Sequence, residues 1–253
     1  MRRLVQPQDL SVVFQPIVEL ATGRLFAHEA LVRCSLPTIA GPPELFERAT
    51  EERCVGRLGR MIREIAVPLC SGMPLFLNVH PQELVERWLV QPDDPIFAHD
   101  HDIYLEITES VPLTHFELVV DVLAELKARA GVHLVIDDLG AGYSNLGFIA
   151  DLEPRVVKLD RGLVQGLDSS PRKQRLVTSL VRLCTELGAK VVAEGVETPG
   201  ELSTLLDTGA HFAQGYVLSR PGFPLPCPSW PAESRKPASP AAPPSAPPKL
   251  GWR

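Results

Sequence analysis

Short apolar runs alternate with amphipathic helical stretches along most of this chain, which limits the folds open to it. Eight runs have strand character: 11–18, 24–33, 74–79, 103–107, 132–136, 156–159, 190–193 and 211–213. A (β/α)8 barrel typically needs ~250 residues, and this chain has 253. We therefore expect an α/β fold, a modified (β/α)8 barrel of the TIM type. The alternative is an open doubly wound sheet, although no GxGxxG follows the first run to indicate dinucleotide binding.

The connection between the first two runs is only the turn Ala21-Thr-Gly23, which predicts a hairpin. The first strand is therefore expected to run antiparallel. Residues 42–69 form a long helical region, and Gly56 and Gly59 mark a candidate break near its middle. Further helices are predicted over 81–90, 114–130, 144–150, 171–187 and 199–207.

The composition changes after residue 223, because the segment 224–253 holds ten prolines separated mainly by Ala and Ser. Such a segment cannot bury enough apolar surface to order itself, so a disordered or polyproline-like tail is expected. The barrel is assigned to residues 1–223 and the tail to 224–253.

Composition also limits the cellular compartments and the binding partners that this protein is expected to have. A net charge of −6 argues against binding polymeric nucleic acid, which favours a basic face. The chain has neither a signal peptide nor 18 consecutive apolar residues, so a soluble, cytoplasmic protein without a membrane segment is expected. Five scattered cysteines without a CxxC motif indicate reduced thiols instead of disulfides or a zinc site.

Polar residues interrupt or end nearly every predicted strand. They are Gln15, Glu29, Asn78, Glu106, Asp137, Asp138, Lys158, Glu194 and Gln214. In a barrel enzyme the carboxyl ends of the strands meet at one mouth. Five carboxylates around a single base would be costly to bury without cations. Two Mg²⁺ or Mn²⁺ ions would balance them and suit phosphodiester hydrolysis.

Each residue taken alone also has a local explanation. Glu29 could pair with Arg33, and Lys158 could neutralise a lone Asp. Glu109 could cap a helix, as could Glu197 with Thr198, and the Asp pair could be a turn that caps the next helix. The full set at one mouth favours a shared metal site over these separate explanations.

These residues also form motifs that resemble the EAL family of bacterial cyclic di-GMP phosphodiesterases. The matching motifs are Gln15-Pro-Ile17, Glu29-Ala-Leu-Val-Arg33, Leu77-Asn-Val-His-Pro81, Glu106-Ile-Thr-Glu109, Asp137-Asp-Leu-Gly-Ala-Gly-Tyr-Ser144, Lys158-Leu-Asp160, Glu194-Gly-Val-Glu197 and Gln214-Gly-Tyr216. They cover about residues 10 to 222 in the family's order. The resemblance implies a barrel with an antiparallel first strand, and metal-dependent cleavage of cyclic di-GMP to linear pGpG.

The resemblance also implies roles for single residues. Glu29, Asn78, Glu106 and Asp137 would hold one metal ion, and Asp137, Asp138 and Glu194 a second. Lys158 or Glu194 would act as the general base, and Gln214 would help to position the water. Gln15, Arg33 and Asp160 would bind substrate, while Glu109 and Glu197 would brace the loop after the fifth strand. In the family that loop couples metal binding to dimerisation, so a homodimer is expected.

Three departures from the family pattern stand in this sequence: Leu139, Ala141 and the segment Cys34-Ser-Leu-Pro37. A catalytically weak sensor of cyclic di-GMP, a protein-binding module and a two-metal hydrolase of another phosphodiester are the alternative functions. No GGDEF-like, receiver or sensory segment precedes Val12. Regulation is therefore expected from a separate protein, dimerisation, substrate level or the tail.

Overall fold

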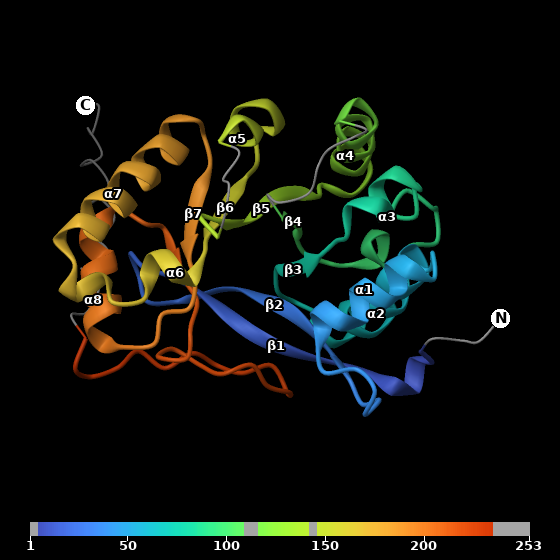
Figure 1. Ribbon diagram of the computed structural model, residues 1–253, viewed down its shortest axis with the longest axis horizontal. Coiled ribbons are helices and arrows are strands. Elements are labelled where there is room, and N and C mark those ends of the chain that lie inside the picture. Colours follow the sequence, from blue (N-terminus) through green and yellow to red (C-terminus); the bar gives the residue numbers. More distant parts are fainter. Residues whose placement is uncertain (1–4, 109–115, 142–145, 235–253) are drawn as a thin grey trace, which may run out of the picture.

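The structure, a computed structural model, describes residues 5–108, 116–141 and 146–234. Eight strands form a closed barrel in sequence order (Figure 1). They are β1 (Leu10–Glu19), β2 (Leu25–Cys34), β3 (Leu75–Asn78), β4 (Ile103–Thr108), β5 (His133–Leu139), β6 (Val156–Leu159), β7 (Lys190–Ala193) and β8 (Phe212–Ala213). The predicted barrel is confirmed, and the open sheet is excluded because β8 pairs with β1.

The first strand has the predicted direction. β1 pairs antiparallel with β2, with Gln15 opposite Glu29, and antiparallel with β8 on its other side. The pairs from β2 to β8 are parallel. The carboxyl ends of these seven strands therefore lie at one mouth of the barrel.

Helices lie outside the barrel on the left, top and right of Figure 1, and irregular chain runs below β1 and β2. The helices are α1 (Pro42–Glu51), α2 (Val55–Leu69), α3 (Pro81–Val85), α4 (Phe116–Ala130), α5 (Gly147–Leu152), α6 (Arg161–Val164), α7 (Pro171–Glu186) and α8 (Pro199–Thr208). Short 3₁₀ turns lie at η1 (Pro7–Asp9), η2 (Pro95–Ala98) and η3 (Leu167–Ser169). No helix in the described parts of the chain is long and apolar enough to cross a membrane.

The long helical region breaks earlier than predicted. It is interrupted between α1 and α2, where Arg53 takes a left-handed backbone with φ of 53°. The two glycines lie inside α2 and permit close packing instead. A Cβ on Gly56 would lie 2.0 Å from Cδ1 of Trp88, and one on Gly59 would lie 2.0 Å from Oε2 of Glu83.

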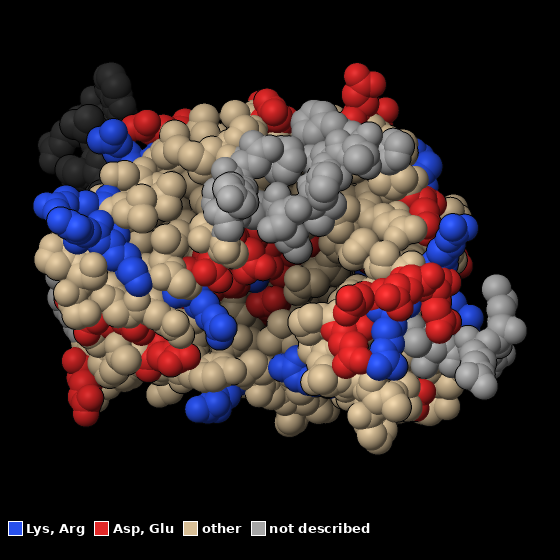
Figure 2. Space-filling view, in the orientation of Figure 1, with Lys and Arg blue, Asp and Glu red and all other residues tan. Residues whose placement is uncertain are grey.

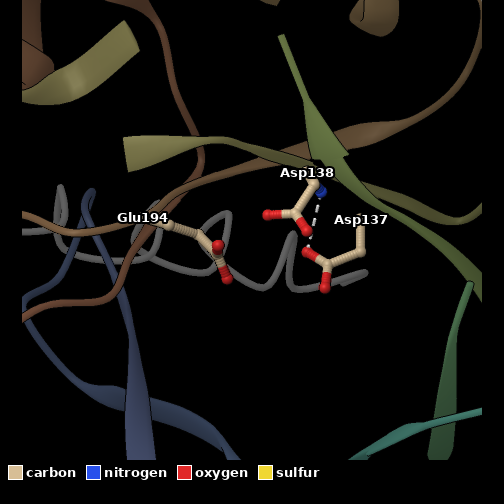
Figure 3. Close-up of side chains that lie close together, drawn as sticks. All are labelled: Asp137, Asp138 and Glu194. Carbon is tan, nitrogen blue, oxygen red and sulfur yellow. Dashed lines mark hydrogen bonds between the residues drawn. The ribbon is translucent and has the colours of Figure 1, made fainter. Parts of the chain in front are cut away.

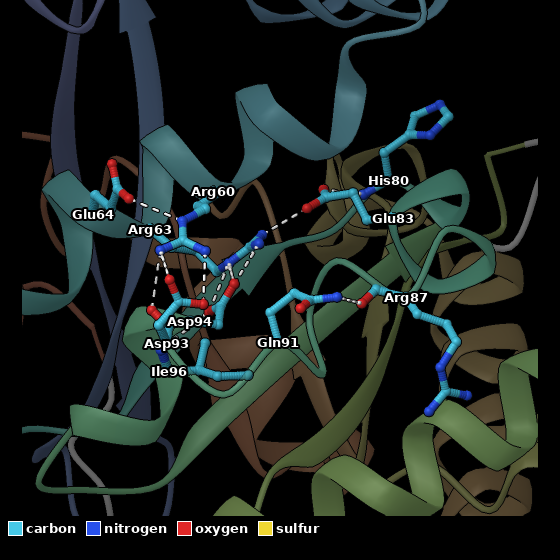
Figure 4. A network of polar contacts seen from close by, with 10 residues as sticks. All are labelled: Arg60, Arg63, Glu64, His80, Glu83, Arg87, Gln91, Asp93, Asp94 and Ile96. Carbon is cyan, nitrogen blue, oxygen red and sulfur yellow. Dashed lines mark hydrogen bonds and ion pairs between the residues drawn. The ribbon is translucent and has the colours of Figure 1, made fainter.

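The carboxylate beside Gly59 belongs to a buried ionic network (Figure 4). Arg63 in α2 donates to Oε2 of Glu83 at 2.6 Å and to Oδ2 of Asp94 at 2.8 Å. Oε1 of Glu83 accepts from the backbone N–H of His80, which precedes α3. The network thus ties α2 to the segment that follows β3 and to the start of η2.

The first residues of the segment predicted to be a tail, 224–234, make contacts with the barrel. His28 Nε2 lies 3.0 Å from the carbonyl oxygen of Pro226, Trp230 packs against a core cluster, and Ser234 is buried. No helix separates β1 from β2, so the outward-facing Phe14 and His28 need another cover. Residues 222–226 supply that cover, and Gly222 bridges to Phe14. Residues 235–253 lie outside the described residues.

Candidate active site

The strands place two layers of side chains inside the barrel, one above the other. The lower layer is apolar and includes Ala27, Phe76, Tyr104, Val135, Val156, Val192 and Phe212. Two residues further along the same strands stand Glu29, Asn78, Glu106, Asp137, Lys158, Glu194 and Gln214. Alternate residues of a strand share a face, so the apolar layer forms a floor beneath a polar layer. The structure brings together every strand-end residue that the sequence singled out.

The two adjacent aspartates reach the same site because the backbone bends between them. Neighbouring strand residues normally point to opposite faces. Here the β5–β6 register shifts between Ile136 and Leu139, and Asp138 has a left-handed φ of 60°. Carboxylate oxygens of Asp137, Asp138 and Glu194 consequently lie within 4.8 Å of one another (Figure 3). Such strained backbone is concentrated at functional sites.

Lys158 lies at the centre of the polar layer and is 1% exposed. Its Nζ lies 2.6 Å from Glu194 Oε1, 2.7 Å from Glu106 Oε1, 3.3 Å from Glu29 Oε2 and 3.5 Å from Asp137 Oδ1. The prediction that it could neutralise a lone Asp is therefore wrong, because it contacts four carboxylates at once.

Amide side chains hold the other face of Glu29. Asn78 donates to its Oε1 at 3.0 Å, and Gln214 donates to its Oε2 at 2.7 Å. Gln214 also contacts Oε1 of Gln15 at 3.2 Å, which links the last strand to the first. The described contacts of Glu29 do not include Arg33, so the local pairing of these two residues is wrong.

Burial and crowding shift the pKa values of these groups. Burial, the charge of Glu29 and other carboxylates raise the pKa of Glu106 well above its usual range, against the pull of Lys158. Burial raises the pKa of Asp137 to about 6 and that of Glu194 to about 8, although Lys158 opposes both shifts. Burial would lower the pKa of Lys158, but the surrounding carboxylates raise it well above its usual value. Burial acts to raise the pKa of Glu29, yet Lys158, Gln214 and Asn78 together lower it.

The donor set fits divalent cations. Oε2 of Glu106 is buried and accepts no hydrogen bond from any described donor. One lysine cannot balance five carboxylates, and oxygen ligands at this density are those that Mg²⁺ and Mn²⁺ prefer. The same carboxylates that crowd Lys158 are thus the ones able to hold metal ions.

A cavity of about 330 Å³ opens above this layer. Acidic side chains gather in the hollow at the middle of this face, and basic side chains stand near its edge (Figure 2). The cavity is lined by Gln15, Glu29, Leu31, Asp137, Asp138, Lys158, Asp160, Arg161, Glu194, Gly195, Glu197, Gln214, Gly215 and Tyr216.

Of the residues predicted to bind substrate or brace the loop, some line the cavity and others do not. Gln15 and Asp160 line the cavity, and Asp160 also accepts from the backbone N–H of Gly162 at the start of α6. Arg33 is not among the described lining residues, and its Nη1 donates to the carbonyl oxygen of Val32 at 2.9 Å. Glu109 lies outside the described residues.

The sequence offered Glu197 and Thr198 together as residues that start the last helix, but the structure gives them different positions. Thr198 caps α8 in a capping box with Glu201, whereas the side chain of Glu197 lines the cavity. Residues 142–145 of the loop that Glu197 was predicted to brace lie outside the described part of the chain.

Two lining residues were missed from the sequence: Arg161 and Tyr216. Both directly follow or end motifs already noted, Lys158-Leu-Asp160 and Gln214-Gly-Tyr216. Proximity to those motifs was the available signal, but it does not show whether a side chain beyond the strand end points into the cavity.

Comparison with known proteins gives a consistent result. The EAL domain family model matches residues 1–221. The cyclic di-GMP phosphodiesterase PA2567 of Pseudomonas aeruginosa is 32% identical over 238 residues, which cover 88% of this chain and 40% of that protein. The cyclic di-GMP phosphodiesterase RocR of the same species is 31% identical over 226 residues, or 84% of this chain and 57% of RocR. This chain thus spans less than two thirds of the length of these relatives.

Solved structures extend the comparison. The manganese/cyclic di-GMP complex of BlrP1 from Klebsiella pneumoniae is 34% identical with a TM-score of 0.73, over 88% of this chain and 58% of BlrP1. The c-di-GMP complex of the PaMucR phosphodiesterase is 27% identical with a TM-score of 0.74, over 85% of this chain and 92% of PaMucR.

Proposed function

This chain belongs to the EAL domain family, and we propose that it is a metal-dependent phosphodiesterase that cleaves one phosphodiester bond of cyclic di-GMP to give linear pGpG. The observation that carries this proposal is the polar layer beneath the open cavity, in which the buried Lys158 contacts four carboxylates and Asp138 lies beside two of them. Similar proteins carry this activity in their names, and a related structure contains manganese with cyclic di-GMP.

Two divalent ions, Mg²⁺ or Mn²⁺, are proposed as cofactors. Glu29, Asn78, Glu106 and Asp137 would hold one, and Asp137, Asp138 and Glu194 the other. Bound there, the ions would lower the pKa of water and neutralise charge on the phosphoryl oxygens. The close approach of Asp137, Asp138 and Glu194 supports the second set, and the unpartnered oxygen of Glu106 supports the first.

The proton transfers are proposed to involve Lys158 and Glu194. A water molecule attacks phosphorus, the bond from phosphorus to the ribose 3′ oxygen breaks, and that oxygen takes up a proton. Glu194 takes the proton lost by water, and the protonated Nζ of Lys158, 2.6 Å from its Oε1, is the neighbouring proton donor. Gln214 positions the water through the hydrogen-bond chain that it shares with Glu29 and Gln15.

The test is incubation of the purified protein with cyclic di-GMP and Mg²⁺ or Mn²⁺, with chromatography of the products and EDTA as the control. Metal-dependent pGpG, absent from the Glu29→Ala variant, is the expected result. Tight binding without product would replace the enzyme with a sensor of cyclic di-GMP or a protein-binding module. Cleavage of other phosphodiesters in preference to cyclic di-GMP would indicate a different hydrolase.

We also propose that the protein acts in the cytoplasm as a homodimer, under the control of a separate regulatory protein. The free state of all five cysteines agrees with a reducing compartment. Exposed Leu146, beside the loop after β5, is an apolar side chain that a second copy could cover. Light scattering with and without metal and cyclic di-GMP measures the oligomeric state directly.

A further inference from the structure

The cavity has an unusual charge balance for a site that takes an anionic substrate. Six carboxylates line it: Glu29, Asp137, Asp138, Asp160, Glu194 and Glu197. Lys158 and Arg161 are the only cations in this described lining. Lys158 is buried and surrounded by four of the carboxylates in and beside the cavity. Arg161 is therefore the one lining cation that is open to a ligand.

Arg161 is held at the edge of the cavity by its own backbone. It opens α6 directly after Asp160, and the base of its side chain lies against Gly195. A Cβ on Gly195 would lie 2.3 Å from Cβ of Arg161, and Gly195 has a φ of +65°. Only glycine fits at this point, so Arg161 stands immediately beside the carboxylate-bearing Glu194.

The guanidinium of Arg161 makes no ion pair or hydrogen bond within the described residues, and the residue is exposed. Arg33 differs in both respects, because it is partly buried and donates to its own strand. A guanidinium is well suited to two parallel hydrogen bonds with phosphate oxygens.

Tyr216 provides a flat surface on the lining of the same cavity. It is 50% exposed, and the guanidinium of Arg220 lies 4.3 Å from its ring centroid. One face of the ring is thereby covered by a cation, and the exposed part is available to stack with a nucleobase.

We propose that Arg161 and Tyr216 form a subsite for the half of the cyclic dinucleotide that is not cleaved. This inference rests on the proposed function. Arg161 binds the second phosphate, and Tyr216 stacks with a base of the same substrate. The carboxylate layer acts at the scissile phosphate. This subsite therefore contributes to substrate affinity and specificity and takes no part in bond cleavage.

The test compares two substrates in the 253-residue chain with Mn²⁺. Cyclic di-GMP has a second phosphate and bases, whereas bis(p-nitrophenyl) phosphate has one phosphate and no base. Arg161→Gln is expected to raise KM for cyclic di-GMP by about tenfold or more, because a charge-assisted hydrogen bond is lost. Its kcat and its hydrolysis of bis(p-nitrophenyl) phosphate should stay close to those of the wild type.

Three further variants complete the experiment. Tyr216→Leu should raise KM for cyclic di-GMP alone, Arg161→Lys should restore part of the loss, and Arg172→Gln on the exposed start of α7 is the matched control. An unchanged KM in Arg161→Gln would overturn the proposal, as would an equal loss with both substrates, which would place Arg161 at the scissile phosphate. If the wild type cleaves neither substrate, the proposed function fails. Equilibrium binding of cyclic di-GMP to the same variants then decides the role of Arg161 separately.

Discussion

At the scale of single residues, the site depends on one backbone conformation that few side chains adopt. Asp138 takes a left-handed φ of 60°, which turns its carboxylate toward those of Asp137 and Glu194. Asp and Asn tolerate this conformation better than most residues with a Cβ. Charge and backbone geometry at this position can therefore be separated by an Asp to Asn change.

Asp138→Asn is expected to keep the fold while lowering kcat/KM for cyclic di-GMP by about 100-fold or more, since even the outer partners of metal ligands cost about 10- to 100-fold. Steady-state kinetics with Mn²⁺ and a thermal melt measure the two effects. Asp121→Asn, on the exposed side of α4, is the control. Near-normal turnover in Asp138→Asn would remove this residue from the metal site.

Lys158 allows a test of the carboxylate layer without any substrate. In metal-free protein, Lys158→Met leaves four buried or partly buried carboxylates without their counter-charge, and loss of one partner of a buried pair costs about 3–5 kcal/mol. The variant should melt well below the wild type in EDTA and gain more than the wild type from added Mn²⁺, which stabilises the folded state by binding.

Scanning calorimetry with EDTA or Mn²⁺ gives the comparison, and Lys127→Met on the exposed face of α4 is the control. If Mn²⁺ raised the melting temperature of neither protein, the layer would not be a divalent metal site.

At the scale of elements, the network around Arg63 fixes the chain that leaves β3. Asn78 ends that strand, and α3 begins three residues later with Glu83 as its capping partner. Arg63 holds Glu83 and Asp94 in a site with almost no solvent access. Two carboxylates share one guanidinium there, so its removal leaves both charges buried and unpaired.

Arg63→Met is therefore expected to lower the free energy of unfolding by about 3–5 kcal/mol. The matched control is Arg60→Met, three residues earlier in α2. Arg60 pairs with the exposed Asp93, and surface pairs contribute only about 0–1 kcal/mol. Urea denaturation of the metal-bound proteins measures both. Equal losses in the two variants would show that burial of the Arg63 network adds nothing.

At the scale of the whole molecule, sequence patterns were sufficient for the barrel and for most of its polar layer. Residues such as Glu29, Lys158 and Gln214 stand two positions beyond apolar strand residues, so strand periodicity alone predicts their meeting. Arg161 opens the short helix α6 and Tyr216 lies in the turn after β8, where no strand periodicity sets the direction of a side chain. The break near Arg53 was also missed, because glycines were taken as breakers although tertiary packing against Glu83 and Trp88 requires them.

The end of the described chain shows the same limit, and it gives the last prediction. Proline content placed the tail at residue 224, yet Leu225 and Trp230 pack on the core and Pro226 contacts His28. Composition does not reveal that no helix connects β1 to β2, or that this segment packs near Phe14 and His28 instead. A chain ending at residue 234 should therefore melt close to the 253-residue chain.

A chain ending at residue 223 should lose about 2 kcal/mol, for partial burial of two large apolar side chains, and melt about 4–8 °C lower. Thermal melts of the two truncations and the 253-residue chain measure the difference. Trp230→Ala in the 253-residue chain should reproduce part of the loss, because it removes a packed ring without shortening the chain. Identical melting of all three chains would mean that residues 224–234 contribute no stability to the barrel, and that the outward face of Phe14 and His28 is stable without a cover.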